Sequence, residues 1–284
     1  MTESADEFAG RAGELLASRI EHNILATVLA GVRLRPSSSS PVFAYIEDGE
    51  GVVVAAALRT PPRPMLATPM DAGTADALMD AWLERDPELP GVNAPREVAR
   101  RLGRAWAQRT GGRSTFALAL AMHTLDRVCD PVRPASGRLR GAGEDDRQLL
   151  IAWTRDFARE AGIGDGADAA NVVDRGIDRG LLHVWDDGGP VAFVGHTPPV
   201  AHVVRIGPVY TPPERRSRGY ASSAVAALSR AALDGGARRC ALYTDLANPT
   251  SNRIYAALGY NRVSEWEDRA FTRSGHGASN PPPS

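Results

Sequence analysis

Lysine is missing from this chain, and all 33 basic side chains are arginines. The Walker phosphate-binding loop requires the pattern GxxxxGK[ST], so a chain without lysine cannot contain it. The glycine-rich dinucleotide fingerprint, GxGxxG, does not occur either. The two most common nucleotide-binding loops are therefore excluded.

Cysteines and long apolar runs are also scarce. The two cysteines, Cys129 and Cys240, stand in different halves without a CxxC pair or a Cys/His cluster, so we expect buried free thiols and neither a disulfide nor a metal site. No run approaches the ~18 apolar residues of a membrane span. The N-terminus, MTESADEF, is acidic, which argues against a secretory signal and predicts a cytoplasmic protein.

Charge of one sign does not dominate the composition. The net charge of −1 gives no global attraction to nucleic acid or to an anionic membrane, so neither is expected as a partner. The 43% hydrophobic and 24% charged residues are ordinary for a globular protein. The length of 284 residues fits one large or two modest domains, and the sequence carries no indication of oligomeric state.

The order of apolar and turn-rich segments predicts two α/β (α+β) halves, each a mixed central sheet flanked by helices. In the first half, residues 13–30 indicate one helix, and PVFAYIE and GVVVAAAL indicate a strand pair. The segment CDPVRPASGRLR is rich in proline and glycine, so we place a boundary near residue 135. The predicted domains are residues 1–135 and 136–273, and the polar tail 274–284 is expected to be disordered.

The stretch RRSRGYASS lies between the strand-like HVVRIGPVY and the helix-like SAVAALSRAAL. The first turn of a helix has N–H groups without partners and carries the positive end of the helix dipole, which favours anions. Gly219 has no Cβ and would let a phosphate approach the backbone, and Arg216 and Arg218 could add charge-assisted contacts. The pattern predicts a diphosphate-like ligand; the alternative is a tight turn with two solvated arginines.

The spacing Arg216-x-x-Gly219-x-Ala221 resembles the acetyl-CoA pyrophosphate motif, R/Q-x-x-G-x-G/A, of the GNAT superfamily of N-acetyltransferases. Upstream, IGPVYTPPERR resembles that family's fourth strand, and downstream, TDLANPTSNRIYAALGYNRV resembles its second cofactor motif. The resemblance covers residues 136–272 and implies that the fourth and fifth strands of the second domain splay apart around the pantetheine arm. The first half has neither motif, so the chain resembles a tandem GNAT protein with a degenerate N-terminal domain, as in mycothiol synthase-like acetyltransferases. An unrelated α/β domain is the alternative for that half.

The resemblance also implies which residues bind the cosubstrate acetyl-CoA. Backbone groups near an expected bulge or edge at Gly207-Pro208 would meet the pantetheine, and the amides of the following loop would cradle the pyrophosphate. The implied cofactor-binding residues are Val209, Tyr210, Thr211, Arg216, Ser217, Arg218, Gly219, Tyr220, Ala221, Ser222, Asn248 and Asn252. Many family members have glycine where Ser217 stands, and a serine is acceptable there only with a negative φ. Asn252 would reach the cofactor, whereas Asn248 would either contact it or cap the next helix.

For catalysis, Tyr255 matches the usual general acid of the family, which protonates the departing thiolate; such acid catalysis contributes about 10²–10⁴-fold. The alternative is that Tyr255 only packs its helix. The general base stays open between His196, Asp245 and water, because the fourth strand carries His202 and Arg205 but no carboxylate.

We therefore expect an acetyl-CoA-dependent N-acetyltransferase that transfers the acetyl group directly to a primary amine, most simply that of a small molecule. The alternative is a non-catalytic CoA-binding or sensor protein with the same fold.

Overall fold

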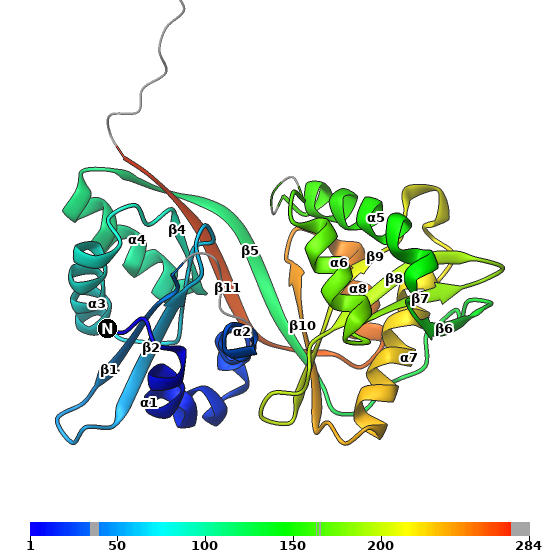
Figure 1. The fold of residues 1–284 in the computed structure, drawn as a ribbon, viewed down its shortest axis with the longest axis horizontal. Coiled ribbons are helices and arrows are strands. Elements are labelled where there is room, and N and C mark those ends of the chain that lie inside the picture. The colour runs from blue at the N-terminus through cyan, green and yellow to red at the C-terminus, as the bar shows by residue number, and fades with distance from the viewer. Residues whose placement is uncertain (35–39, 163, 165, 274–284) are drawn as a thin grey trace, which may run out of the picture. The chain divides into compact units, whose positions relative to one another are not determined.

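The computed structural model describes residues 1–34, 40–162, 164 and 166–273 (Figure 1). The chain forms two compact units: Met1–Ala121 together with Ser264–Ser284, and Met122–Val263. The predicted tail, residues 274–284, lies outside the described residues. Among the described helices, none is long and apolar enough to cross a membrane.

The first unit is a mixed sheet with helices packed on it. Its helices are α1 (Ala5–Ser18), α2 (Asn23–Leu34), α3 (Ala72–Arg85) and α4 (Arg96–Thr110), with a short 3-10 turn at Ile20–His22. Its strands are β1 (Val42–Glu47), β2 (Val53–Arg59), β3 (Met65–Ala67), β4 (Gly91–Pro95), and parts of β5 (Arg113–Leu125) and β11 (Asn261–Thr272). The strand order is β1-β2-β3-β4-β11-β5, and the parallel pair β3–β4 among antiparallel neighbours makes the sheet mixed, as predicted.

The single helix predicted over residues 13–30 is wrong. Two helices form instead, because the helical backbone is interrupted between Ser18 and Asn23. At this interruption, Nδ1 of the buried His22 lies 2.7 Å from the carbonyl oxygen of Leu15. Apolar residues continue at helical spacing across this break, so periodicity alone could not reveal it.

The second unit repeats the same kind of layering (Figure 1). Its strands are β6 (Arg138–Gly141), β7 (Leu182–Asp186), β8 (Pro190–His196), β9 (Val203–Tyr210) and β10 (Arg239–Asp245), in the order β10-β9-β8-β7-β6. Its helices are α5 (Arg147–Glu160), α6 (Ala169–Asp178), α7 (Tyr220–Asp234) and α8 (Pro249–Ala257), with 3-10 turns at Glu144–Asp146 and Pro213–Arg215.

Two hydrophobic cores hold the helices of the second unit on opposite faces of its sheet. Buried residues of α5 and α6, including Trp153 and Val173, pack with Phe193 and Tyr210 of the strands. Residues of α7 and α8, including Tyr255, pack with a different set of strand residues. Because successive strand residues point to opposite faces, the two cores assign each strand side chain to one face.

The compact units differ from the predicted boundary near residue 135. The last residues of β5 belong to the second unit: Leu125 packs in its core, and Met122 Sδ lies 3.5 Å from the hydroxyl of Tyr243. The proline-rich connector that follows is tied into the same unit, because Trp185 Nε1 donates to the carbonyl oxygen of Ser136 at 2.7 Å. A change in composition therefore marked a connector inside a unit rather than a division between units.

The C-terminal strand accounts for the other difference. From Ser264 onward, β11 belongs to the first unit, where it pairs with β4 in an antiparallel register from Trp266↔Pro95 to Ala270↔Gly91. Trp266 is completely buried there, and Glu267 is 1% exposed and bonds Arg100. The fifth strand position of the first sheet, next to β4, is thus filled by residues more than 150 positions away in the sequence.

Candidate functional site

Strands β9 and β10 separate after a short ladder. They pair in parallel at three positions only, Val203↔Arg239 to Arg205↔Ala241, although β9 continues to Tyr210 and β10 to Asp245. On its other side, β9 stays paired with β8 through Val194↔Val209 and Phe193↔Tyr210. The later half of β9 therefore has one open edge, and the predicted splay between these two strands is confirmed.

The bulge expected at Gly207-Pro208 is also present. The register between β8 and β9 shifts between Val194 and His196, so β9 holds an extra residue opposite Gly195. A Cβ on Gly195 would lie 3.1 Å from the carbonyl oxygen of Gly207, which shows how closely the two strands approach at this point. The bulge redirects the backbone of β9 where its open edge begins.

The open edge of β9 leads to the N-terminus of α7. Helix α7 begins after Gly219, which has no side chain to cap the helix. Helices α4, α5 and α6 also begin without a side-chain cap, whereas α1, α3 and α8 have one. At the end of β9, before the loop that leads to α7, the buried Oγ1 of Thr211 has no hydrogen-bond partner among the described residues. Uncapped amides at a helix start and an orphaned hydroxyl together suit an anionic ligand rich in acceptor oxygens.

Gly219 is required by the fold as well as by any ligand. Its φ of +83° lies in the left-handed region, and a Cβ there would come 2.6 Å from the carbonyl oxygen of Arg133. A larger residue at 219 would therefore disturb the chain whether or not phosphate binds. Substituting Gly219 cannot separate loss of a ligand from loss of local structure.

Ser217 adopts the conformation that the sequence argument excluded for a serine. Its φ is +63°, in the left-handed region that favours glycine. The turn thus has the backbone shape that a glycine would give it, and Ser217 is held in a conformation that is strained for a residue with a Cβ. The expected alteration of the loop by a negative φ at this position is wrong.

This strain predicts that Ser217→Gly stabilises the protein. A glycine meets no steric penalty at this φ, so we expect the free energy of unfolding to rise by about 0.5–1 kcal/mol. Urea denaturation would measure the change. Ser18→Gly, at the end of α1 in ordinary helical backbone, is the matched control and should lower stability instead. A stability loss at position 217 equal to that at position 18 would contradict the argument.

The two arginines of the loop differ. Arg216 is engaged by the protein: its Nη2 lies 2.6 Å from Oε2 of Glu160, and its Nε donates to the carbonyl oxygen of Thr211 at 2.9 Å. Arg218 is exposed and makes no ion pair with any described residue. Two equally available phosphate ligands were expected, and only Arg218 is uncommitted.

Among the other expected loop contacts, Tyr220 turns inward, and its hydroxyl donates to Oδ2 of Asp187 at 2.7 Å. Ser222 donates its hydroxyl to the carbonyl oxygen of Gly219 at 2.9 Å. At these two positions only the backbone groups are available to a ligand, because the side-chain hydroxyls already bond within the protein. Ala221, between them, has a small, partly buried side chain.

Both asparagines of the second motif organise the turn between β10 and α8. Asn248 caps α8, accepting the N–H of Ser251 at 3.1 Å. Asn252 accepts from Thr244 Oγ1 at 2.5 Å, and its amide group donates to the carbonyl oxygens of Asp245 and Asn248. Since its polar atoms are used within the turn, Asn252 holds the start of α8 in place, the task expected of Asn248.

Tyr255 projects from α8 into the core shared with α7. Its side chain is 9% exposed and packs edge-on against Tyr260, with ring centroids 6.0 Å apart. Burial raises the pKa of the Tyr255 phenol to about 12, so it stays protonated at neutral pH. Its hydroxyl forms no hydrogen bond with any described residue, which leaves the proton available to a ligand.

The two side chains left open as the general base, His196 and Asp245, are placed differently. His196 ends β8, with Nδ1 3.0 Å from the carbonyl oxygen of Thr197. A carbonyl oxygen only accepts, so Nδ1 carries the proton of this contact, and in the neutral ring Nε2 carries the lone pair. Asp245 accepts the N–H of Ala247 at 2.8 Å and closes the turn after β10. His202 is exposed in the turn before β9, with a φ of +62°.

His196 shares a face of the sheet with Tyr255. It lies opposite Ile206 across the strands, and Ile206 packs in the same core as Tyr255. The sequence did not indicate its neighbour His183, whose ring lies 5.4 Å from that of His196 and whose Nδ1 is buried without a described partner. Burial, and then the neighbouring His196, lower the pKa of His183. An alternating pattern in β7 and β8 could have placed both histidines on one face.

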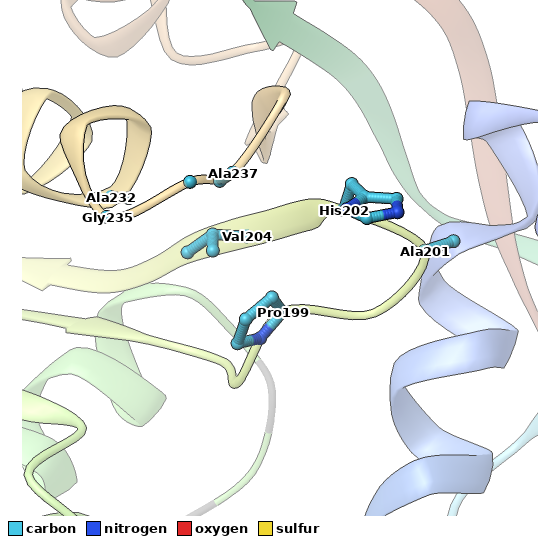
Figure 2. Close-up of a pocket in the computed structure, with 8 residues that line it drawn as sticks. Pro199, Ala201, His202, Val204, Ala232, Gly235 and Ala237 are labelled. Carbon is cyan, nitrogen blue, oxygen red and sulfur yellow. The ribbon is translucent and has the colours of Figure 1, made fainter.

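A separate cavity of about 360 Å³ lies at the other end of β9 (Figure 2). It is lined by Pro199, Ala201, His202, Val204, Ala232, Gly235, Gly236 and Ala237. These residues surround the start of β9 and the C-terminal end of α7. Because α7 has 15 residues, its two ends are about 22 Å apart, and this cavity is distinct from the loop at Gly219.

Cysteine and metal chemistry contribute little to this region. Cys240 is buried, which raises the pKa of its thiol to about 11, whereas Cys129 is exposed rather than buried as expected. The described residues contain no group of three or more His, Cys, Asp or Glu side chains placed to hold a metal ion.

Comparison with known proteins identifies the class of this site. Residues 148–260, all within the second unit, match the model of the Acetyltransferase (GNAT) family. No curated protein matches the chain significantly. The second unit therefore contains an acetyltransferase domain of the GNAT family.

Solved structures extend the likeness of fold to the whole chain. A GCN5-related N-acetyltransferase from Sphaerobacter thermophilus is 16% identical with a TM-score of 0.61, and the match covers 96% of this chain and 93% of that chain. A tandem GNAT protein from the clavulanic acid biosynthesis pathway is 16% identical with a TM-score of 0.59, over 98% of both chains. A Drosophila protein is 13% identical with a TM-score of 0.65, over 96% and 97%. The predicted fold, two GNAT-like domains in tandem, is confirmed.

Proposed function

We propose that this protein is an acetyl-CoA-dependent N-acetyltransferase that transfers the acetyl group directly to a primary amine of a small molecule. The observation that carries the proposal is the open edge of β9, which leads from the bulge at Gly207 to the uncapped N-terminus of α7. An extended arm with amide groups can pair with such an edge, and a diphosphate can accept from the amides at its end.

The residues at the site fit acetyl-CoA as a ligand. In the proposal, the backbone of Val209 and Tyr210 meets the pantetheine, and the orphaned hydroxyl of Thr211 donates to an oxygen of the ligand. The amides from Ser217 to Ser222 and the side chain of Arg218 surround the diphosphate. Asn248 and Asn252 act on the ligand indirectly, by holding the start of α8.

Bound acetyl-CoA would supply an activated thioester, which an amine attacks at the carbonyl carbon. Tyr255, protonated at neutral pH, gives its proton to the sulfur as the carbon–sulfur bond breaks. Nε2 of His196, directly or through water, takes the proton that the amine loses. The buried thiol of Cys240 stays protonated, which argues against a covalent acyl-cysteine intermediate there.

The first unit differs at the corresponding helix. Its α3 is capped by Asp71, whose Oδ1 accepts the N–H of Thr74 at 2.7 Å. This hydrogen bond lowers the pKa of Asp71, so the helix start already holds a negative charge. A diphosphate would be repelled from it, and we infer one acetyl-CoA site per chain.

Calorimetric titration with acetyl-CoA tests the proposal, with an expected stoichiometry of one per chain. Ala221→Asp should abolish this binding, because its carboxylate would lie among the amides that the diphosphate needs. An acidic residue in the first helical turn favours the helix, so the variant should unfold at the wild-type temperature or above. Ala221→Asn, which adds similar bulk without charge, is the matched control and should retain measurable affinity. Wild-type protein that binds no acetyl-CoA would refute the proposal.

A second candidate is a non-catalytic CoA-binding protein. It is favoured by the absence of any Asp or Glu from β9, whose sequence is VVRIGPVY. Release of free CoA thiol in the presence of a panel of primary amines separates the two functions. Binding without amine-dependent thiol release would favour the non-catalytic candidate.

A further inference from the structure

The guanidinium of Arg216 is held from three directions by the second unit. Besides Oε2 of Glu160 and the carbonyl oxygen of Thr211, it faces the ring of Tyr210, with Cζ 5.8 Å from the ring centroid. The hydroxyl of Tyr210 lies 3.5 Å from Oε1 of the same Glu160. Glu160 is the last residue of α5, so a helix on one face of the sheet is joined to the loop after β9.

These contacts fix the residue directly before the strained part of the loop. Ser217, with its positive φ, follows Arg216, and Gly219 begins α7 two residues later. One edge of the guanidinium, Nε and Nη2, is occupied by carbonyl and carboxylate, whereas Nη1 has no partner among the described residues. The arrangement sets both the path of the backbone and the direction in which the remaining N–H groups of Arg216 can point.

We propose that Glu160 is a positioning residue for the diphosphate loop, which it holds through Arg216 in the shape that binds acetyl-CoA. The inference rests on the proposed function of the same site. Glu160 does not touch the ligand; its effect passes through the guanidinium. No local pattern around Glu160 indicated this role, because the two residues are 56 positions apart.

Charge alone would act in the opposite direction. A carboxylate near a diphosphate repels it, so removing Glu160 should tighten binding if its only effect were electrostatic. Both Glu160 and Arg216 have side chains that are 45% exposed, so solvent weakens this repulsion. Without Glu160 the loop would be less ordered, and this lowers the affinity for acetyl-CoA. The backbone amides of the loop would then have to become ordered when the ligand binds, which costs free energy.

The two effects are separated by substitutions at one position. Glu160→Ala should raise the dissociation constant for acetyl-CoA by about three- to tenfold, the range of a typical hydrogen bond, because solvent weakens this half-exposed pair. Glu160→Gln should restore most of the affinity, since its amide oxygen still accepts from Nη2. Asp156→Ala is the matched control: Asp156 lies one turn earlier on α5, pairs with Arg159, and should leave binding unchanged.

A second ligand distinguishes positioning of the loop from a general effect on folding. S-acetylpantetheine lacks the diphosphate, so its weaker binding should be the same in wild type and Glu160→Ala, measured by competition or by its own titration. Equal or tighter binding of acetyl-CoA by Glu160→Ala would overturn the inference, and so would an equal loss for both ligands. If the wild type binds no acetyl-CoA, the proposed function fails and this inference fails with it. If the wild type binds acetyl-CoA but Glu160→Ala binds it with an unchanged dissociation constant, only this inference fails and the proposed function stands.

Discussion

Tyr255→Phe is expected to slow acetyl transfer by about 10²–10⁴-fold while leaving the affinity for acetyl-CoA unchanged. The substitution removes only the hydroxyl, and the ring that packs against Tyr260 stays. Because this hydroxyl bonds no described residue, its loss should not lower the stability of the protein. Because its pKa is raised to about 12, the phenol is protonated throughout the range from pH 6 to pH 9, so the loss should be uniform across it.

Tyr260→Phe is the matched control for this experiment. Its hydroxyl lies 2.8 Å from Oγ of Ser229 in a buried pair, so removing it should cost about 1–3 kcal/mol of stability. Transfer by the folded Tyr260→Phe protein should stay near the wild-type rate. Thiol release from acetyl-CoA with an amine acceptor measures both variants. Unchanged turnover in Tyr255→Phe would show that Tyr255 is a packing residue and not the acid.

A chain that ends at Val263 is expected to lose the fold of the first unit. It would lack the part of β11 that pairs with β4 over five residue pairs, from Trp266↔Pro95 to Ala270↔Gly91. Removal of a fully buried tryptophan alone costs about 3–5 kcal/mol, comparable to the stability of many domains. Arg100 would also lose the buried carboxylate of Glu267.

Hydrogen exchange measures this effect unit by unit. Protection should fall throughout residues 1–121, and a chain that ends at Arg273, which keeps all of β11, is the control. Wild-type protection of residues 1–121 in the shorter chain would contradict the assignment of Ser264 and the following residues to the first unit. By the same reasoning, a fragment of residues 136–284 would omit Met122–Leu125 and would carry the part of β11 that pairs with β4 without β4 itself, so residues 122–263 make the better isolated domain.

Much of the site follows from local chemistry that a sequence displays. Gly219 starts α7 with a positive φ, Asn248 caps α8 before Pro249, and the bulge at Gly207 interrupts β9, all at the predicted positions. Each depends on the conformational limits of a single residue type at a turn or a strand end. Such limits act over a few residues, so they can be recognised without knowing the rest of the fold.

Other features of the site depended on partners that are distant in the sequence. Arg216, an expected phosphate ligand, is held by Glu160, and Ser217 accepts a glycine-like φ within the loop that this contact anchors. The use of the Asn252 side chain within the turn, where a contact with the cofactor was expected, likewise depends on how the turn after β10 folds back on α8. Residue types and spacing indicated where the loop and the turn lie, but not which hydrogen bonds each side chain would make.

The sequence by itself determined that this chain has two α/β halves and indicated where the turn before α7 and the helix that carries Tyr255 stand in the second. Only the tertiary structure decided that the end of β5 belongs to the second unit and that most of β11 belongs to the first. The physical reason is that hydrophobic periodicity and turn residues report how each segment buries its own side chains. The choice of neighbouring strand depends on which open sheet edge a segment reaches after the chain has folded, and for β4 that segment arrives from the far end of the sequence.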